Sequence, residues 1–193
     1  MIREHSDVDF PVIKRIKIQL DEEADRLVFI AETVCHGTQK LLLTRRILIL
    51  LLHRFELLLI KANKAIAMAP QHKNEIFKME LISAAESAKH PPPDTSKITH
   101  NDRQANQAYL ITKITTQIKD KMIIIAFLGK TEGDVASNLH SSSAISALKL
   151  NRFDAYNLFG MICKKMDDAD WNIQALPDWL ERDEAIRSLR RTI

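Results

Sequence analysis

The chain has 193 residues, of which 46% are hydrophobic and 27% charged, and its formal net charge is +3. These values are typical of an ordered globular protein with a sizeable core, and they exclude a largely disordered chain. So small a positive charge permits a nucleic-acid partner without indicating one. The four glycines match neither a phosphate-loop nor a dinucleotide-binding pattern, so we predict no nucleotide cofactor.

The first part of the chain predicts three strands followed by a helix. Residues 12–20 alternate apolar and polar side chains over their second half, which is the period of a strand with one buried face. A second apolar run at 27–33 completes a hairpin, and a short strand ends at Leu43. Thr44 then offers a side-chain oxygen to cap a long helix. We assign residues 1–69 to this first sheet-plus-helix unit.

The long helix, expected from Arg45 to about Ala65, is apolar on more than one face. Its core face holds Ile47, Leu48, Leu51, Leu52, Phe55, Leu58, Leu59 and Ala62. Four further aliphatic side chains lie among the charged residues of the opposite face: Ile49, Leu50, Leu57 and Ile60. Leaving these four in water forgoes roughly 1.5–3 kcal/mol each, so we expect another helix or another molecule to cover them. The charged residues that interrupt the apolar run exclude a membrane span.

Residues 70–106 are expected to form a connector that contains one helix, over residues 75–90. Three prolines at 91–93 end this helix, and a polar loop follows. Because its small residues permit close helix approach, we expect this helix to cover the outward aliphatic side chains of the long helix.

The order of the first unit returns in residues 107–170. We predict strands at 109–118, 122–128 and 145–150, and Asn151 then precedes a helix as Thr44 does. With an offset of 107 residues, five core positions of the long helix fall on apolar residues of the second helix: Ala155, Leu158, Phe159, Ile162 and Met166. We therefore predict an internal repeat.

The fold class that follows is α+β. We expect two tandem strand-strand-strand-helix units related by pseudo-twofold symmetry, joined by the helical connector and closed by a C-terminal helix in residues 171–193. These segments would together form one compact domain.

Several reactive residues adjoin one another without forming a site of known chemistry. His140 precedes three serines, Cys35 precedes His36, and Asp167, Asp168 and Asp170 cluster at a helix end. None has the spaced partners that a catalytic triad, a closed zinc site or a calcium loop requires. We therefore predict no catalytic, cofactor-binding or metal-binding residues. Without a secretion signal, the two distant cysteines, Cys35 and Cys163, indicate reduced thiols in a cytoplasmic protein.

These patterns favour a non-enzymatic binding or assembly protein. Its expected interface is the second apolar set, Ile49, Leu50, Leu57 and Ile60, which would bind a protein partner or a second copy in a homodimer. The alternative is a single-stranded nucleic-acid-binding protein that uses the cations of its two leading hairpins: Lys14, Arg15, Lys17, Lys113, Lys119 and Lys121. An enzyme whose site is assembled from scattered residues is the third hypothesis.

Overall fold

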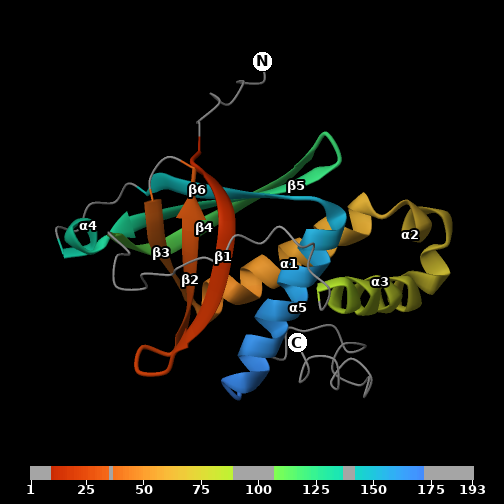
Figure 1. The fold of residues 1–193 in the computed structure, drawn as a ribbon, viewed down its shortest axis with the longest axis horizontal. Coiled ribbons are helices and arrows are strands. Elements are labelled where there is room, and N and C mark those ends of the chain that lie inside the picture. Colours follow the sequence, from red (N-terminus) through yellow and green to blue (C-terminus); the bar gives the residue numbers. More distant parts are fainter. Residues whose placement is uncertain (1–9, 35–36, 89–106, 137–141, 172–193) are drawn as a thin grey trace.

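A computed structural model describes residues 10–34, 37–88, 107–136 and 142–171 (Figure 1). The described chain is mixed α+β, as the sequence predicts. Its elements in chain order are β1 Val12–Asp21, β2 Arg26–Thr33, β3 Gly37–Thr44, α1 Arg45–Ala62, α2 Lys64–Met68, the 3-10 helix η1 Pro70–His72, α3 Lys73–Ala88, β4 Gln107–Lys119, β5 Met122–Thr131, α4 Glu132–Ala136, β6 Ser143–Leu150 and α5 Arg152–Asp168.

The six strands close into a barrel in the order β1-β2-β3-β4-β5-β6. Neighbouring strands are antiparallel within β1-β2-β3 and within β4-β5-β6. The two sets join through parallel pairs, β3 with β4 at Leu41 and Tyr109, and β1 with β6 at Ile13 and Leu148. Both parallel pairs are short, since they involve only Val12 and Ile13 of β1 and residues 107–110 of β4.

Alternation along the strands places two phenylalanine side chains inside the barrel. Phe29 of β2 and Phe127 of β5 are fully buried and meet edge to face, with ring centroids 6.3 Å apart. Both β1 and β4 carry an irregularity in register near their first inward isoleucine, at Ile13 and Ile111. An extra residue at such a bulge reverses the alternation that follows, so Ile18 and Ile114 also point inward and are buried.

The long helices α1 and α5 pack against each other and against the barrel, α1 chiefly on β4 and α5 on β1, β5 and β6. The core face predicted for α1 is buried at Ile47, Leu48, Leu51, Leu52, Phe55 and Leu59, whereas Leu58 and Ala62 are only half-buried. Phe55 of α1 and Phe159 of α5 form an edge-to-face pair between the two helices. Figure 1 shows α2 and α3 beyond these helices, on the side of the barrel opposite to α4.

Helix α3 packs chiefly on α5, so the expectation that it covers the outward side of α1 is wrong. Its anchor is Phe77, whose ring centroid lies 4.9 Å from that of Tyr156 and 5.7 Å from that of Phe159. Leu81 and Ala84 of α3 are also buried. The apolar stripe of α3 was recognisable in the sequence, but the stripe carries no signal for which helix it meets.

The two long helices begin differently. Thr44 occupies the N-cap position of α1 but makes no side-chain cap bond, contrary to expectation, whereas the Asn151 side chain accepts a hydrogen bond from the Asp154 N–H at 2.9 Å. Helix α1 ends at Ala62, three residues before the expected boundary, and the side chain of the next residue, Asn63, caps α2. Helix α4 lies in a segment for which the sequence predicted no element, and the C-terminal helix expected in 171–193 lies, apart from Trp171, outside the described residues.

Candidate functional site

The outward side of α1 carries two exposed leucines. Leu50 is 36% exposed and Leu57 is 54% exposed, and a separation of about two helical turns places them on the same side of the helix. Most large aliphatic side chains of the described chain are instead buried or half-buried. These two leucines therefore form an apolar stripe that nothing within the described residues buries.

The other two members of the predicted interface, Ile49 and Ile60, are placed differently. Both are half-buried and pack against the hydrophobic core, so most of their apolar surface is already out of water. On a helix of about 100° per residue they lie together on one flank of α1, and the two leucines lie beyond them towards solvent. The structure thus separates the four predicted residues into two exposed and two largely covered side chains.

An open groove of about 650 Å³ runs between α1 and β4 beside Leu50. Its apolar wall includes Ile49 and Leu50 from the helix and Leu110 from the strand, while Arg46, His53 and Thr112 supply polar groups. Nearby, the Arg54 guanidinium donates a hydrogen bond to the Ile114 carbonyl and so ties α1 to β4. The apolar surface around Leu50 therefore continues from the helix onto the barrel.

Two basic residues of α1 bond to other elements: Arg54 to the backbone of β4, and Arg45, which is exposed, to Asp25. Arg46, His53 and Lys61 are also exposed. On the helical wheel Arg46, His53 and Lys61 surround the Leu50 and Leu57 stripe.

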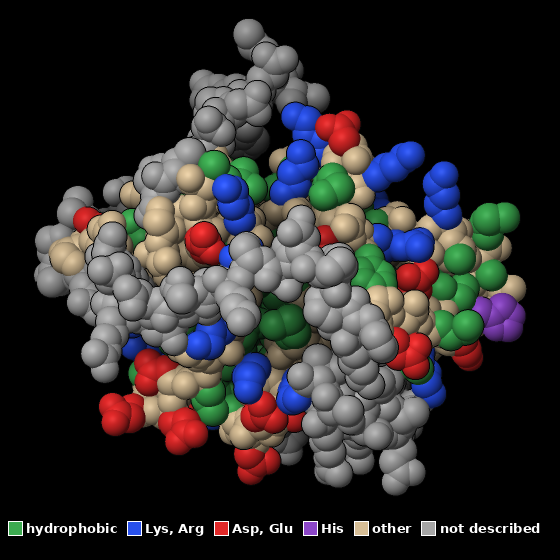
Figure 2. All heavy atoms as spheres, viewed as in Figure 1, with side chains coloured by type: hydrophobic (Ala, Val, Ile, Leu, Met, Phe, Trp, Pro, Cys, Tyr) green, Lys and Arg blue, Asp and Glu red, His purple; other side chains and the backbone are tan. Residues whose placement is uncertain are grey.

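The hairpin cations predicted for nucleic-acid binding lie on two separate parts of the barrel. Lys14, Arg15 and Lys17 are on β1, whereas Lys113, Lys119 and Lys121 are on β4 and the turn that follows it. Two strands separate β1 from β4 in either direction around the barrel, so the two sets do not form one continuous row. Figure 2 shows Lys and Arg side chains projecting around the β4-β5 hairpin at the upper right, whereas acidic side chains gather at the lower left.

The cross-strand pairing reveals a feature of these faces that the sequence reading missed. Lys17 and Lys40 flank the apolar side chain of Ile30 in one row across β1, β2 and β3. On the other sheet Gln117, Ile124 and Lys149 form a comparable row. Lys40 and Lys149 became candidates only once the register was known, because they come from strands distant in sequence from the hairpin cations.

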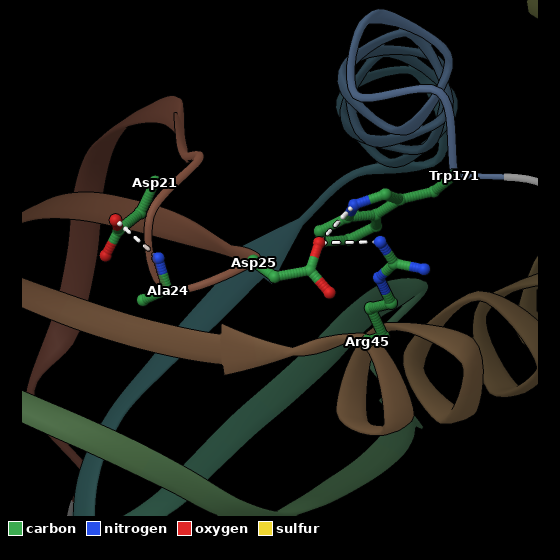
Figure 3. Close-up of polar contacts among 5 residues, drawn as sticks. All are labelled: Asp21, Ala24, Asp25, Arg45 and Trp171. Carbon is green, nitrogen blue, oxygen red and sulfur yellow. Dashed lines mark hydrogen bonds and ion pairs between the residues drawn. The ribbon is translucent and has the colours of Figure 1, made fainter.

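A polar cluster joins the β1-β2 turn, the first turn of α1 and Trp171, which lies three residues beyond the end of α5 (Figure 3). One Asp25 carboxylate oxygen accepts hydrogen bonds from the Arg45 guanidinium at 2.6 Å and from the Trp171 indole N–H at 2.8 Å. The Arg45 guanidinium also lies over the Trp171 ring, 4.8 Å from its centroid. Arg45 beside Asp25 holds the pKa of this carboxyl below its ordinary value, and the Trp171 bond acts in the same direction. The cluster is a structural tie between distant segments.

A smaller cavity of about 220 Å³ opens at one end of the barrel. Gln39 lines it and is only 5% exposed, and its side-chain oxygen has no hydrogen-bond partner among the described residues. Tyr109 also lines the cavity, its hydroxyl donates to the Gln107 side chain at 2.6 Å, and burial raises its pKa. No spacing in the sequence indicated this cavity, because its wall comes from the ends of several strands.

The residues considered for chemistry do not come together in the described structure. His140, Ser141, Cys35 and His36 lie outside the described residues, and Ser142 bonds to Thr112 at 2.8 Å. Asp168 pairs with Lys165 at 2.9 Å. Across the described ranges, no group of three His, Cys, Asp or Glu side chains is placed to hold a metal ion.

Comparison with known proteins finds no protein-family model, curated protein or solved structure that matches this chain. Of the helices in the described part of the chain, none has the length and apolar character needed to span a membrane.

Proposed function

We propose that this protein is a non-enzymatic binding or assembly protein whose partner docks on the outward side of α1. The observation that carries this proposal is the exposure of Leu50 and Leu57 on one side of the helix, beside the open groove between α1 and β4. Apolar side chains beside a groove are the kind of surface on which a partner helix lays its own apolar face. Their burial by a partner would contribute roughly 1.5–3 kcal/mol for each side chain.

The packing of α1 supports a narrower interface than the sequence predicts. Ile49 and Ile60 already rest on the core, so they would border the docked partner while Leu50 and Leu57 enter it. Because α3 packs on α5, the stripe stays open to a partner from outside the described chain.

A paired measurement tests this function and its homodimer version. The full chain and its Leu50→Ser, Leu57→Ser variant are compared by light scattering at micromolar concentration and by binding of an apolar dye. For the homodimer we expect twice the chain mass, reduced to a monomer in the variant. For a different partner we expect a monomer whose dye binding falls in the variant. A monomer with unchanged dye binding would refute the proposal, and Met79→Ser, at a 70% exposed position on α3, is the matched control.

The second candidate is single-stranded nucleic-acid binding through the barrel surface. It is supported by the lysines that the strand register brings into rows, Lys17 and Lys40 in one row and Lys149 beside Ile124 in the other. Such cations neutralise backbone phosphates, whereas Ile30, between Lys17 and Lys40, is only 3% exposed and offers no surface to a base. The same rows carry no exposed aromatic side chain, which favours the α1 interface over this candidate.

A salt-dependent titration with a labelled oligothymidine tests the second candidate. Lys14→Glu with Lys17→Glu changes one set of cations, and Lys113→Glu with Lys119→Glu changes the other. Because the two sets of cations lie on separate strands, we expect one double substitution to abolish oligonucleotide binding and the other double substitution to leave it nearly unchanged. Lys73→Glu with Lys164→Glu matches the charge change elsewhere. An absence of binding at low salt would end this candidate.

We also propose that the chain consists of two tandem units related by pseudo-twofold symmetry. Support comes from matching positions: the bulges of β1 and β4, and the buried pair Phe29 and Phe127, share an offset of 98 residues. From the third strand onward the offset is 107 residues, and the five matched core positions of α5 are all buried. Gln39 and Ser146, both buried polar residues, match at the same offset.

A further inference from the structure

The outward face of α1 combines apolar anchors with positive charge. Leu50 and Leu57 lie along its centre, and the exposed side chains around them are Arg46, His53 and Lys61. The one acidic residue of α1, Glu56, is half-buried and on the helical wheel falls on the flank with Ile49 and Ile60. The solvent-facing surface of this helix is thus apolar and cationic.

This charge pattern disfavours a symmetric pair of α1 helices. An antiparallel pair centred between Leu50 and Leu57 sets Leu50 against Leu57 of the second copy, and the same register sets Arg46 against Lys61. A parallel pair sets each cation beside its own counterpart. Like charges brought together across an interface cost free energy, so a second copy is a poor occupant of this face.

The groove indicates what shape of occupant would fit. It is open, it lies between a helix and a strand, and its apolar wall continues the leucine stripe onto Leu110. A helix with apolar side chains at intervals of three and four residues presents a matching ridge, as in helix-in-groove recognition. Carboxylates beside that ridge would meet Arg46 and Lys61.

We propose that the occupant of the α1 face is an acidic amphipathic helix of another protein. This inference rests on the proposed function of α1 and adds the chemistry of the partner. The leucines supply the apolar contact, and the surrounding cations select carboxylates over ammonium groups at the rim.

Three synthetic peptides of equal length and helicity test the proposal by fluorescence anisotropy. The first has a leucine stripe flanked by glutamates, the second has the same stripe flanked by lysines, and the third has the glutamates with its leucines dispersed. We expect the first to bind about tenfold more tightly than the second, since each exposed ion pair contributes little and only a few can form. We expect the third not to bind.

Variants of the protein separate the apolar contribution to peptide binding from the ionic contribution. Leu57→Ser should weaken binding of the glutamate-flanked peptide roughly tenfold, whereas Met79→Ser should not. Arg46→Glu with Lys61→Glu should reverse the preference, so that the lysine-flanked peptide binds more tightly. A preference that does not reverse, or equal affinity for the two striped peptides, overturns the acidic partner.

The outcomes also distinguish this inference from the function beneath it. If both striped peptides bind equally and Leu57→Ser weakens both, α1 is a docking face without charge selection. If the chain is a dimer that Leu57→Ser dissociates, assembly through α1 stands and the acidic partner falls. If no peptide binds and the Leu50→Ser, Leu57→Ser variant binds the dye as well as the parent chain does, both the proposed function and the acidic partner are refuted.

Discussion

Asp25 shows how one side chain ties distant parts of the molecule together. Its backbone φ of +49° places it in the left-handed region at the β1-β2 turn, where aspartate is among the better tolerated residues. From there its carboxylate reaches both Arg45 and Trp171. The charge of Asp25 therefore links a hairpin to the start of one long helix and the end of the other.

The pKa of Asp25 makes this link dependent on pH. Because Arg45 lowers the pKa of the folded carboxyl below its ordinary value of 3.8, the contribution to stability is present above that value. It is lost as the pH falls through the folded pKa. We expect Asp25→Asn to be less stable than the parent chain at pH 7 and the difference to shrink as the pH falls below 3.8, measured by urea unfolding at a series of pH values. Glu23→Gln is the control in the same turn, and a difference that stays constant as the pH falls would contradict the assignment.

Gly129 is a second residue whose identity the packing requires. A Cβ atom at this position would lie 2.5 Å from the Leu110 carbonyl oxygen, and a backbone atom in a paired strand cannot swing aside. We expect Gly129→Ala to lower the free energy of unfolding by about 1–3 kcal/mol, measured by urea denaturation. Gly133→Ala is the matched control, since its nearest neighbour would be the Thr131 side chain at 3.8 Å. Equal stability of the two variants would show that β4 and β5 move apart enough to accommodate the added methyl group of Gly129→Ala.

At the scale of elements, the starts of α1 and α5 look alike in sequence and differ in structure. The Asn151 side chain caps α5, whereas that of Thr44 makes no cap bond to α1. We expect Asn151→Ala to cost about 1 kcal/mol of unfolding free energy and Thr44→Ala only a few tenths. Urea unfolding of the two variants, with helix content followed by circular dichroism, gives the comparison. Equal losses would mean that Thr44 caps α1 in solution.

The strands and long helices could be predicted from the sequence because their periodicity records burial directly. The alternation in β1 and the apolar sector of α1 involve only neighbouring residues, and they indicate whether a segment is a strand or a helix and which of its faces points inward. The element against which each inward face packs could not be predicted in this way. Phe77 packs on Tyr156 of α5, and nothing in the pattern of α3 distinguishes that contact from one with α1.

The candidate interface was predicted in outline for the same reason. An aliphatic excess on α1 is visible in the sequence, but only packing shows that Leu57 is exposed while Ile60 rests on the core. The groove beside Leu50 required the position of β4, which follows α1 by more than forty residues. Sites assembled across such separations leave no local pattern.

At the scale of the whole molecule, closure of the barrel depends on contacts between β1-β2-β3 and β4-β5-β6. The parallel pairs β3-β4 and β1-β6 supply the backbone link, and Phe29 and Phe127 supply a side-chain link across the interior. Hairpins alone would have permitted two separate sheets, so the sequence did not predict closure. The two phenylalanines offer a direct measure of how strongly the halves are coupled.

A double-mutant cycle on Phe29→Leu and Phe127→Leu measures this coupling. Each leucine keeps the core apolar but removes the edge-to-face pair, so the second substitution should cost less once the first is present. We expect a coupling energy of about 0.5–1.5 kcal/mol from urea unfolding of the four proteins. Phe29→Leu combined with Phe153→Leu, at a 36% exposed position on α5, should be additive. Additivity of the Phe29 and Phe127 substitutions would instead mean that the halves close without this pair. Closure would then depend on the parallel strand pairs and on the rest of the shared core.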